Sequence, residues 1–201
     1  MLTRAIGATA HFIIEGIVHV LALTRIHPNF FTAFGLVINI YGAYLFGSGQ
    51  FCQAGLVVVG AGLFDMLDGR IARVTNTTSV FGGFFDSVID RYSDLAIYIG
   101  LLVYYSRVDR FFYVVLVAVV MVGSVMVSYS RARAENVIAS CKVGFMERPE
   151  RVVLIIIGAL WDRMAPVLWI LAALSNITVI HRIIHTWEAT QTPPAKNSVA
   201  S

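Results

Sequence analysis

Two long stretches without a charged side chain constrain this chain more than any other feature. Residues 26–64 contain no Asp, Glu, Lys or Arg, and residues 111–130 form a second uncharged run. Of the 201 residues, 58% are hydrophobic and only 13% are charged, which is too apolar for an ordinary soluble domain. A run of about twenty apolar residues is long enough for a helix to cross a bilayer. We therefore expect an all-α integral membrane protein that crosses the membrane several times.

Six transmembrane helices are predicted. The turn-like sequence Gly47-Ser48-Gly49-Gln50 divides the first uncharged stretch into two spans. The fifth span is the shortest, beginning near Pro149, a residue suited to a first helical turn, and ending by Asp162. The remaining three are expected at about Phe81 to Tyr105, Phe111 to Ser130 and about Met164 to Ile180.

The two ends of the chain differ from this six-helix domain, which is expected to cover residues 25–190. Residues 1–24 carry charged and histidine side chains throughout, instead of the basic start and clean apolar core of a secretory signal. This pattern predicts an amphipathic helix lying at the membrane interface. Residues 191–201 contain Pro-Pro and small polar residues, which predicts a disordered tail.

The distribution of Lys and Arg predicts the orientation. Eleven of the fifteen lie at the termini and in the second and fourth connections, whereas three lie in the other connections. Cytoplasmic connections carry the excess of positive charge. Both termini are therefore expected on the cytoplasmic side of the inner membrane.

Four aspartates near the ends of the second and third spans form the most informative polar pattern. Asp65 and Asp68 are three residues apart, and Asp86 and Asp90 four apart, so each pair projects from one face of its helix. If the two helices pack side by side, the four carboxylates converge. Such acids are costly at membrane depth unless they are paired or bind a metal, and an all-oxygen site suits Mg²⁺, Mn²⁺ or Ca²⁺. Asp94 continues the stripe and is expected to pair with an arginine.

The residues around these acids complete the pattern Asp-x2-Asp-Gly-x2-Ala-Arg-x8-Gly-x3-Asp-x3-Asp, which resembles the signature of the CDP-alcohol phosphotransferase family. The resemblance implies a homodimeric membrane enzyme that displaces CMP from a CDP-linked lipid with the hydroxyl of a small alcohol. It also implies two divalent cations, with Mg²⁺ expected ahead of Mn²⁺. Asp65, Asp68 and Asp86 would be metal ligands. Asp90 would bind the second metal and act as general base, on the cytoplasmic side.

The same resemblance assigns contacts with the CDP-lipid. An Asn and a Thr lie in a Pro-Asn-x-x-Thr segment that stands beside the nucleotide in the family, although either could simply cap the first span. Two glycines would let the ligand approach the backbone, and an arginine would bind phosphate; alternatively, the glycines permit close helix packing and the arginine marks the cytoplasmic side. These residues are Asn29, Thr32, Asp68, Gly69, Arg73 and Gly82.

Residues 129–151 hold five of the fifteen basic residues and indicate the acceptor. An anionic, phosphorylated acceptor is the simplest reason for such a cluster, because arginine binds phosphate in a forked geometry; topology alone is the competing explanation. Arg-Ala-Arg-Ala-Glu followed by Glu-Arg-Pro-Glu-Arg resembles the phosphatidylinositol-phosphate synthase branch, where the first basic position is more often lysine. The expected acceptor-phosphate ligands are Arg131, Arg133 and Arg151, with Arg148 and Arg182 as further candidates.

Together these features predict transfer of a phosphatidyl group from CDP-diacylglycerol to a phosphorylated polyol. Inositol 1-phosphate is the expected acceptor, giving phosphatidylinositol phosphate and CMP, and glycerol 3-phosphate is the alternative. A cation transporter would also use intramembrane acids, but these acids gather at one membrane face and no inverted repeat is found. No nucleic-acid partner is expected.

Overall fold

The computed structural model is entirely helical in the part that it describes, which is the backbone of residues 28–74 and 78–191 and the side chains of residues 29–65 and 78–191. The helices are α2 (Pro28–Gly47), α3 (Phe51–Val74), α4 (Val80–Arg107), α5 (Phe111–Ala134), α6 (Arg148–Leu160) and α7 (Met164–Gln191). The predicted interfacial helix and nearly all of the predicted tail lie outside the described residues. The helix α3 continues past Asp65, as the placement of Asp65 and Asp68 on one helix requires, and α7 continues beyond the predicted end of the last span at about Ile180.

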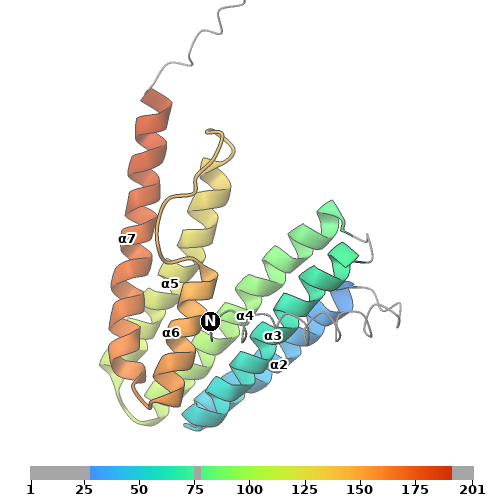
Figure 1. Ribbon diagram of the computed structural model, residues 1–201. Coiled ribbons are helices and arrows are strands. Elements are labelled where there is room, and N and C mark those ends of the chain that lie inside the picture. The colour runs from blue at the N-terminus through green and yellow to red at the C-terminus, as the bar shows by residue number, and fades with distance from the viewer. Residues whose placement is uncertain (1–27, 75–77, 192–201) are drawn as a thin grey trace, which may run out of the picture.

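The helices form two groups of three that meet at one end and diverge at the other (Figure 1). In the first group α2 packs against both α3 and α4; in the second, α7 packs against α5 and α6. Contacts of α4 with α5 and of α3 with α6 join the groups. The start of α4 and the ends of α3, α5 and α7 all lie at the diverging end (Figure 1). The acid-bearing and arginine-bearing segments therefore face one another across this end.

Small residues and tight turns make this arrangement possible. Gly49, in the turn between α2 and α3, has a φ of 79°, a conformation that glycine adopts without strain. A Cβ atom at Gly100 of α4 would overlap the carbonyl oxygen of Ala43 in α2. The two backbones are thus in direct contact, as small residues permit in membrane helix pairs.

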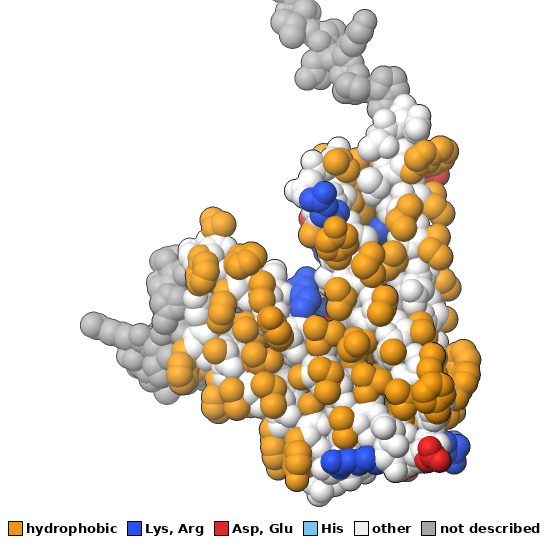
Figure 2. All heavy atoms as spheres, turned by 180° about the vertical axis from the view of Figure 1, so that it is seen from behind, with side chains coloured by type: hydrophobic (Ala, Val, Ile, Leu, Met, Phe, Trp, Pro, Cys, Tyr) orange, Lys and Arg blue, Asp and Glu red, His pale blue; other side chains and the backbone are white. Residues whose placement is uncertain are grey.

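Large apolar side chains fill the interior and also cover the outside. Phe46, Tyr98 and Leu101 are fully buried in the core, whereas aromatic and aliphatic side chains such as Tyr44 and Trp169 are exposed on the outer surface (Figure 2). By length and composition α2, α5 and α7 can each cross a membrane. The protein is therefore a multi-pass membrane protein.

The other three predicted spans are less apolar or shorter. The apolar part of α3 is Phe51–Asp65, and α4 carries acids in its first half. At about 1.5 Å per residue, the 13 residues of α6 reach roughly 20 Å, less than a hydrocarbon core of about 30 Å. The total of six spans stays a prediction.

Candidate functional site

A cavity of about 370 Å³ lies where α4 faces α5, α6 and α7. We call it the arginine cavity, because five arginines from these four helices line it. Figure 2 shows Lys and Arg side chains at the base of the notch between the two helix groups. The arginines are Arg91, Arg131, Arg148, Arg151 and Arg182.

Arg151 is held by a buried carboxylate. Its side chain is 2% exposed, and Nη2 donates to Oδ2 of Asp94 at 2.7 Å. Ser124 Oγ lies 3.3 Å from the same oxygen, and Arg151 Nη1 donates to the carbonyl of Met146 at 3.2 Å. The Nε atom of Arg151 is buried without a hydrogen-bond partner among the described residues. The guanidinium is therefore fixed in direction and keeps a donor unused.

Arg182 is fixed by backbone carbonyls. Although it lies well along α7, only 1% of its side chain is exposed. Nε donates to the carbonyl of Val143 at 2.9 Å, Nη1 donates to that of Val127, and Nη2 lies 3.1 Å from Oε1 of Glu147. Because two backbone groups set its orientation, Arg182 presents one side of its guanidinium to the cavity.

Arg131 completes this corner of the cavity. Its Nη1 lies 3.1 Å from the same Glu147 oxygen, so one carboxylate oxygen bridges Arg131 and Arg182. Its Nε donates to Glu135 at 3.1 Å, and this hydrogen bond lowers the pKa of the Glu135 carboxyl. Glu147 itself precedes α6 as its N-cap and makes no side-chain capping hydrogen bond. The corner thus holds two guanidinium groups around one carboxylate oxygen.

The acid cluster is organised around Arg148, the first residue of α6. Arg148 Nη1 contacts Asp65 of α3 and lies 2.8 Å from Oδ1 of Asp90 in α4. Its Nε lies 3.5 Å from Oδ1 of Asp94. The two acid-bearing helices have few direct contacts with each other, because α3 packs mainly on α2 and α6, and α4 on α2 and α5. A guanidinium from a third helix joins their carboxylates instead.

The remaining acids bear on metal binding. Asp86 is half-buried on α4 and interacts electrostatically with Asp65 and Arg148. Asp68 lies on α3, but its side chain is outside the described set, and within that set no three acidic, His or Cys side chains form a metal site. Carboxylates from two helices nevertheless share one cationic nitrogen, so they are placed to share a cation. An all-oxygen donor set of this kind fits Mg²⁺ or Mn²⁺ in place of the guanidinium.

The predicted nucleotide contacts lie where α2 and α4 begin. A Cβ atom at Gly82 would stand 3.6 Å from Oδ1 of Asn29 and 3.0 Å from Oγ of Ser79. Ser79 caps α4 by accepting a hydrogen bond from the Gly82 amide at 2.9 Å. Thr32 is buried on α2. Gly69 and Arg73 lie on α3, in the stretch whose side chains fall outside the description.

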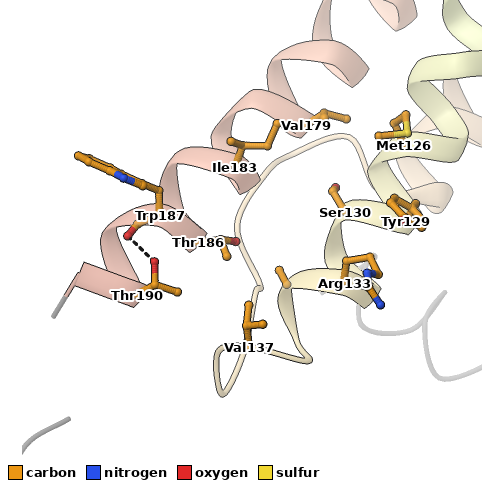
Figure 3. Close-up of a pocket in the computed structure, with 11 residues that line it drawn as sticks. Met126, Tyr129, Ser130, Arg133, Val137, Val179, Ile183, Thr186, Trp187 and Thr190 are labelled. Atoms are coloured by element: carbon orange, nitrogen blue, oxygen red, sulfur yellow. Dashed lines mark hydrogen bonds between the residues drawn. The ribbon is translucent and has the colours of Figure 1, made fainter. Parts of the chain in front are cut away.

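Arg133 does not belong to the arginine cavity, contrary to its predicted grouping with Arg131. It lines a separate pocket of about 500 Å³ between α5 and α7, beside Met126, Ile183 and Trp187 (Figure 3). Residues two apart on an α-helix point about 200° apart, so both arginines cannot face the same cavity. We call this second space the apolar pocket.

Sequence reasoning missed Glu147 and Ser124 as parts of this site. Glu147 opens the Glu-Arg-Pro-Glu-Arg segment that resembles the family branch, but a role was predicted only for the arginines of that segment. Asp94 was expected to pair with an arginine, and it does, but with Arg151 and Arg148 from the distant α6. Its position four residues after Asp90 was the signal that found it.

A family comparison covers nearly the whole described region. The model of CDP-alcohol phosphatidyltransferase matches residues 25–188. Among curated proteins, an archaetidylinositol phosphate synthase of Pyrococcus horikoshii is 38% identical over 172 residues, which is 85% of this chain and 88% of the relative.

Two solved structures are similar in fold. The Mycobacterium tuberculosis phosphatidylinositol phosphate synthase with CDP-DAG bound gives a TM-score of 0.83 at 31% identity, covering 94% of this chain and 99% of that one. The same mycobacterial enzyme in complex with manganese and citrate gives 0.79 at 30% identity, covering 93% of both chains.

Proposed function

This chain belongs to the CDP-alcohol phosphatidyltransferase family, and we propose that it transfers a phosphatidyl group from CDP-diacylglycerol to inositol 1-phosphate, releasing CMP. The names of the similar proteins support the inositol phosphate acceptor. CDP-diacylglycerol is the donor proposed first, because CDP-DAG is bound in the mycobacterial structure.

One observation carries the proposal: a cavity lined by five arginines adjoins a cluster of carboxylates, and Arg148 touches both. Neither half alone specifies this chemistry, since acids also serve ion pathways and arginines also mark membrane topology. Side by side they provide an anion site for the acceptor next to a cation site for the donor pyrophosphate. The path of a cation transporter does not require an anion site.

The acceptor is held by its phosphate group. Arg131, Arg151 and Arg182 offer guanidinium groups from α5, α6 and α7, and at least two of them have their direction set by buried partners. Forked, charge-assisted hydrogen bonds from three directions would orient the acceptor as well as bind it. Its reacting hydroxyl then points toward α4.

Asp90 is proposed as the general base. Its carboxylate takes the proton of the acceptor hydroxyl, whose oxygen forms a bond to the lipid-side phosphorus while the bond from that phosphorus to the CMP oxygen breaks. CMP leaves as a phosphate of low basicity, so no protein acid is required. The buried Asp94 carboxylate binds Arg151 and so holds its guanidinium group in position for the acceptor phosphate.

Asp65, Asp68, Asp86 and Asp90 would hold two divalent cations, with Mg²⁺ preferred to Mn²⁺. When bound, such ions neutralise charge on the pyrophosphate. The donor's CDP group would extend toward Asn29 and Gly82, together with Thr32, Gly69 and Arg73. Gly82, at the start of α4, lies close to Asn29, since a Cβ atom at Gly82 would be 3.6 Å from Asn29 Oδ1.

The proposal includes the setting of the enzyme. We infer six spans, both termini and the site on the cytoplasmic side of the inner membrane, and a homodimer. A common side for the two ends is supported by Figure 1, in which the start of α2 and the end of α7 lie at the diverging end. The proposed catalytic domain is residues 25–190.

The test is CMP release by the purified protein with Mg²⁺ and CDP-diacylglycerol. The acceptors to compare are myo-inositol 1-phosphate, glycerol 3-phosphate and free inositol. Stimulation by inositol phosphate alone is expected, with loss of activity after chelation of the metal. Stimulation by glycerol 3-phosphate instead would support the proposed type of reaction but refute inositol 1-phosphate as the acceptor.

A further inference from the structure

Glu147 occupies the place that the acceptor phosphate needs. Its Oε1 atom lies 3.1 Å from both Arg131 Nη1 and Arg182 Nη2, and all three residues line the arginine cavity. A carboxylate oxygen between two guanidinium groups resembles one oxygen of a bound phosphate in charge and in hydrogen-bonding geometry. The cavity therefore contains an internal anion at a corner suited to an external one.

Glu147 is free to leave this position. Its side chain is 41% exposed, whereas the side chain of Asp94, the partner of Arg151, is 9% exposed and also bound by Ser124. Although Glu147 is the N-cap of α6, its carboxylate caps no backbone amide. Removing it from the two arginines would therefore break no capping hydrogen bond of α6 and would place its charge in water.

The two arginines cannot follow it. Arg182 is anchored by the carbonyls of Val127 and Val143, and Arg131 keeps its separate hydrogen bond to Glu135. If Glu147 swings out, both guanidinium groups stay in the cavity, and Arg182, whose side chain is 1% exposed, loses its only carboxylate partner among the described residues. A buried unpaired charge is strongly unfavourable, so a new anion is favoured there.

On these contacts, and resting on the proposed function, we propose that Glu147 is an internal competitor that sets the phosphate affinity of this corner, because it competes with the acceptor's phosphate for Arg131 and Arg182. A site that must first release an internal ligand binds every phosphate more weakly by the same factor. Inorganic phosphate, which has no other contacts, then falls below useful affinity. A phosphate ester whose polyol hydroxyl groups contact the rest of the cavity remains bound.

The same competition acts after the reaction. The product retains the acceptor's phosphate in its headgroup, so the return of Glu147 to Arg131 and Arg182 helps to expel it. Replacing the carboxylate by an amide of equal size should therefore tighten phosphate binding and slow product release together. A residue that merely supported the fold would do neither.

The experiment measures binding of inorganic phosphate to the purified full-length protein without CDP-lipid, by titration calorimetry. Glu147→Gln should bind phosphate about tenfold more tightly than the wild type, since two charge-assisted contacts become available. The acceptor KM should fall and kcat should also fall.

The matched control is Glu135→Gln, which removes the same charge from the same cavity but from Arg131 alone. Its phosphate affinity should rise less than about threefold, an increase typical of a single exposed pair. An equal gain in both variants would reduce the effect to net charge and overturn the proposal. Unchanged phosphate affinity in Glu147→Gln would also overturn the proposal. The Glu147→Ala variant repeats the test without the hydrogen bonds that the glutamine amide could form.

This inference and the proposed function fail in different ways. If inositol phosphate does not stimulate CMP release by the wild type, the proposed reaction is wrong whatever the phosphate titration shows. If Glu147→Gln and the wild type bind phosphate equally while CMP release is normal, the reaction stands and the role of Glu147 is wrong.

Discussion

Two cavities lie on opposite sides of the end of α5, and they differ in what surrounds their arginines. The arginine cavity contains five guanidinium groups, each beside a carboxylate or a backbone carbonyl that sets its direction. The apolar pocket is larger, at about 500 Å³, but is lined by Met, Val, Ile and Trp side chains and by Arg133 alone among charged groups (Figure 3).

The comparison shows that a run of arginines in the sequence does not define an anion site. Arg131 and Arg133 are separated by one residue, yet among the described residues only Arg131 forms ion pairs, with Glu135 and Glu147. An anion site requires guanidinium groups that converge and are held in place. The following variants test that distinction in order of expected effect.

Asp90→Asn should have the largest effect, because it removes the proposed base next to the arginine cavity. General-base catalysis contributes about 10²–10⁴-fold to a reaction rate. The rate of CMP release should therefore fall by at least about 10²-fold, while CDP-lipid binding persists. Asp109→Asn is a suitable control, since Asp109 lies in the α4–α5 turn with a φ of 54° that Asn also tolerates. Substantial turnover in Asp90→Asn would exclude the base assignment.

Arg151→Ala should raise the acceptor KM by about two orders of magnitude, because a charged, forked contact is lost. It should also lower the free energy of unfolding, but by less than the cost of a fully unpaired buried charge, about 3–5 kcal/mol, because buried Asp94 loses Arg151 but keeps Arg148 and Ser124. The double variant Arg151→Ala/Asp94→Asn separates the two effects: thermal unfolding should recover, whereas KM should stay high. Recovery of KM in the double variant would mean that Arg151 acts only on stability.

Arg131→Ala and Arg133→Ala make the most direct comparison, since they remove the same side chain two positions apart on one helix. The first should raise the acceptor KM by about tenfold through loss of one charge-assisted contact. The second should change it by less than about twofold, as an exposed charge outside the cavity would. Equal effects would show that the cluster acts through its overall charge.

Filling the apolar pocket should have the smallest effect on the reaction. Ile183→Trp places a larger side chain on the exposed face of α7, in the pocket and away from the arginine cavity. Steady-state assays should give an acceptor KM within about twofold of the wild type, since surface substitutions away from special features are usually mild. A large rise in KM would indicate that the two cavities communicate.

Much of the local structure was predictable from the sequence. The helix starts at Phe111 and Met164 agree with the apolar runs, and Pro149 lies in the first turn of α6. These features were predictable because they depend on local sequence alone, namely on the length of an apolar run and on residues that favour a helix start. The last helix continues beyond the predicted end of its span at Ile180, and on it Arg182 is buried and donates to two backbone carbonyls.

The site was predictable in its parts but not in its arrangement. The spacing of Asp65, Asp86, Asp90 and Asp94 indicated clustered acids, and the signature indicated their family. The sequence by itself thus determined the membrane character, the helices and the inventory of charged groups, since these follow from residue type and helical period.

Only the tertiary structure decided which charges meet. It placed Arg148 among the carboxylates, Arg133 in another pocket and Glu147 between two arginines from α5 and α7. The partners in each case are many residues apart, and their meeting depends on how α6 sits against α3 and α7. Helical periodicity fixes the face on which a side chain projects, but the neighbour on that face is set by the packing of the whole bundle.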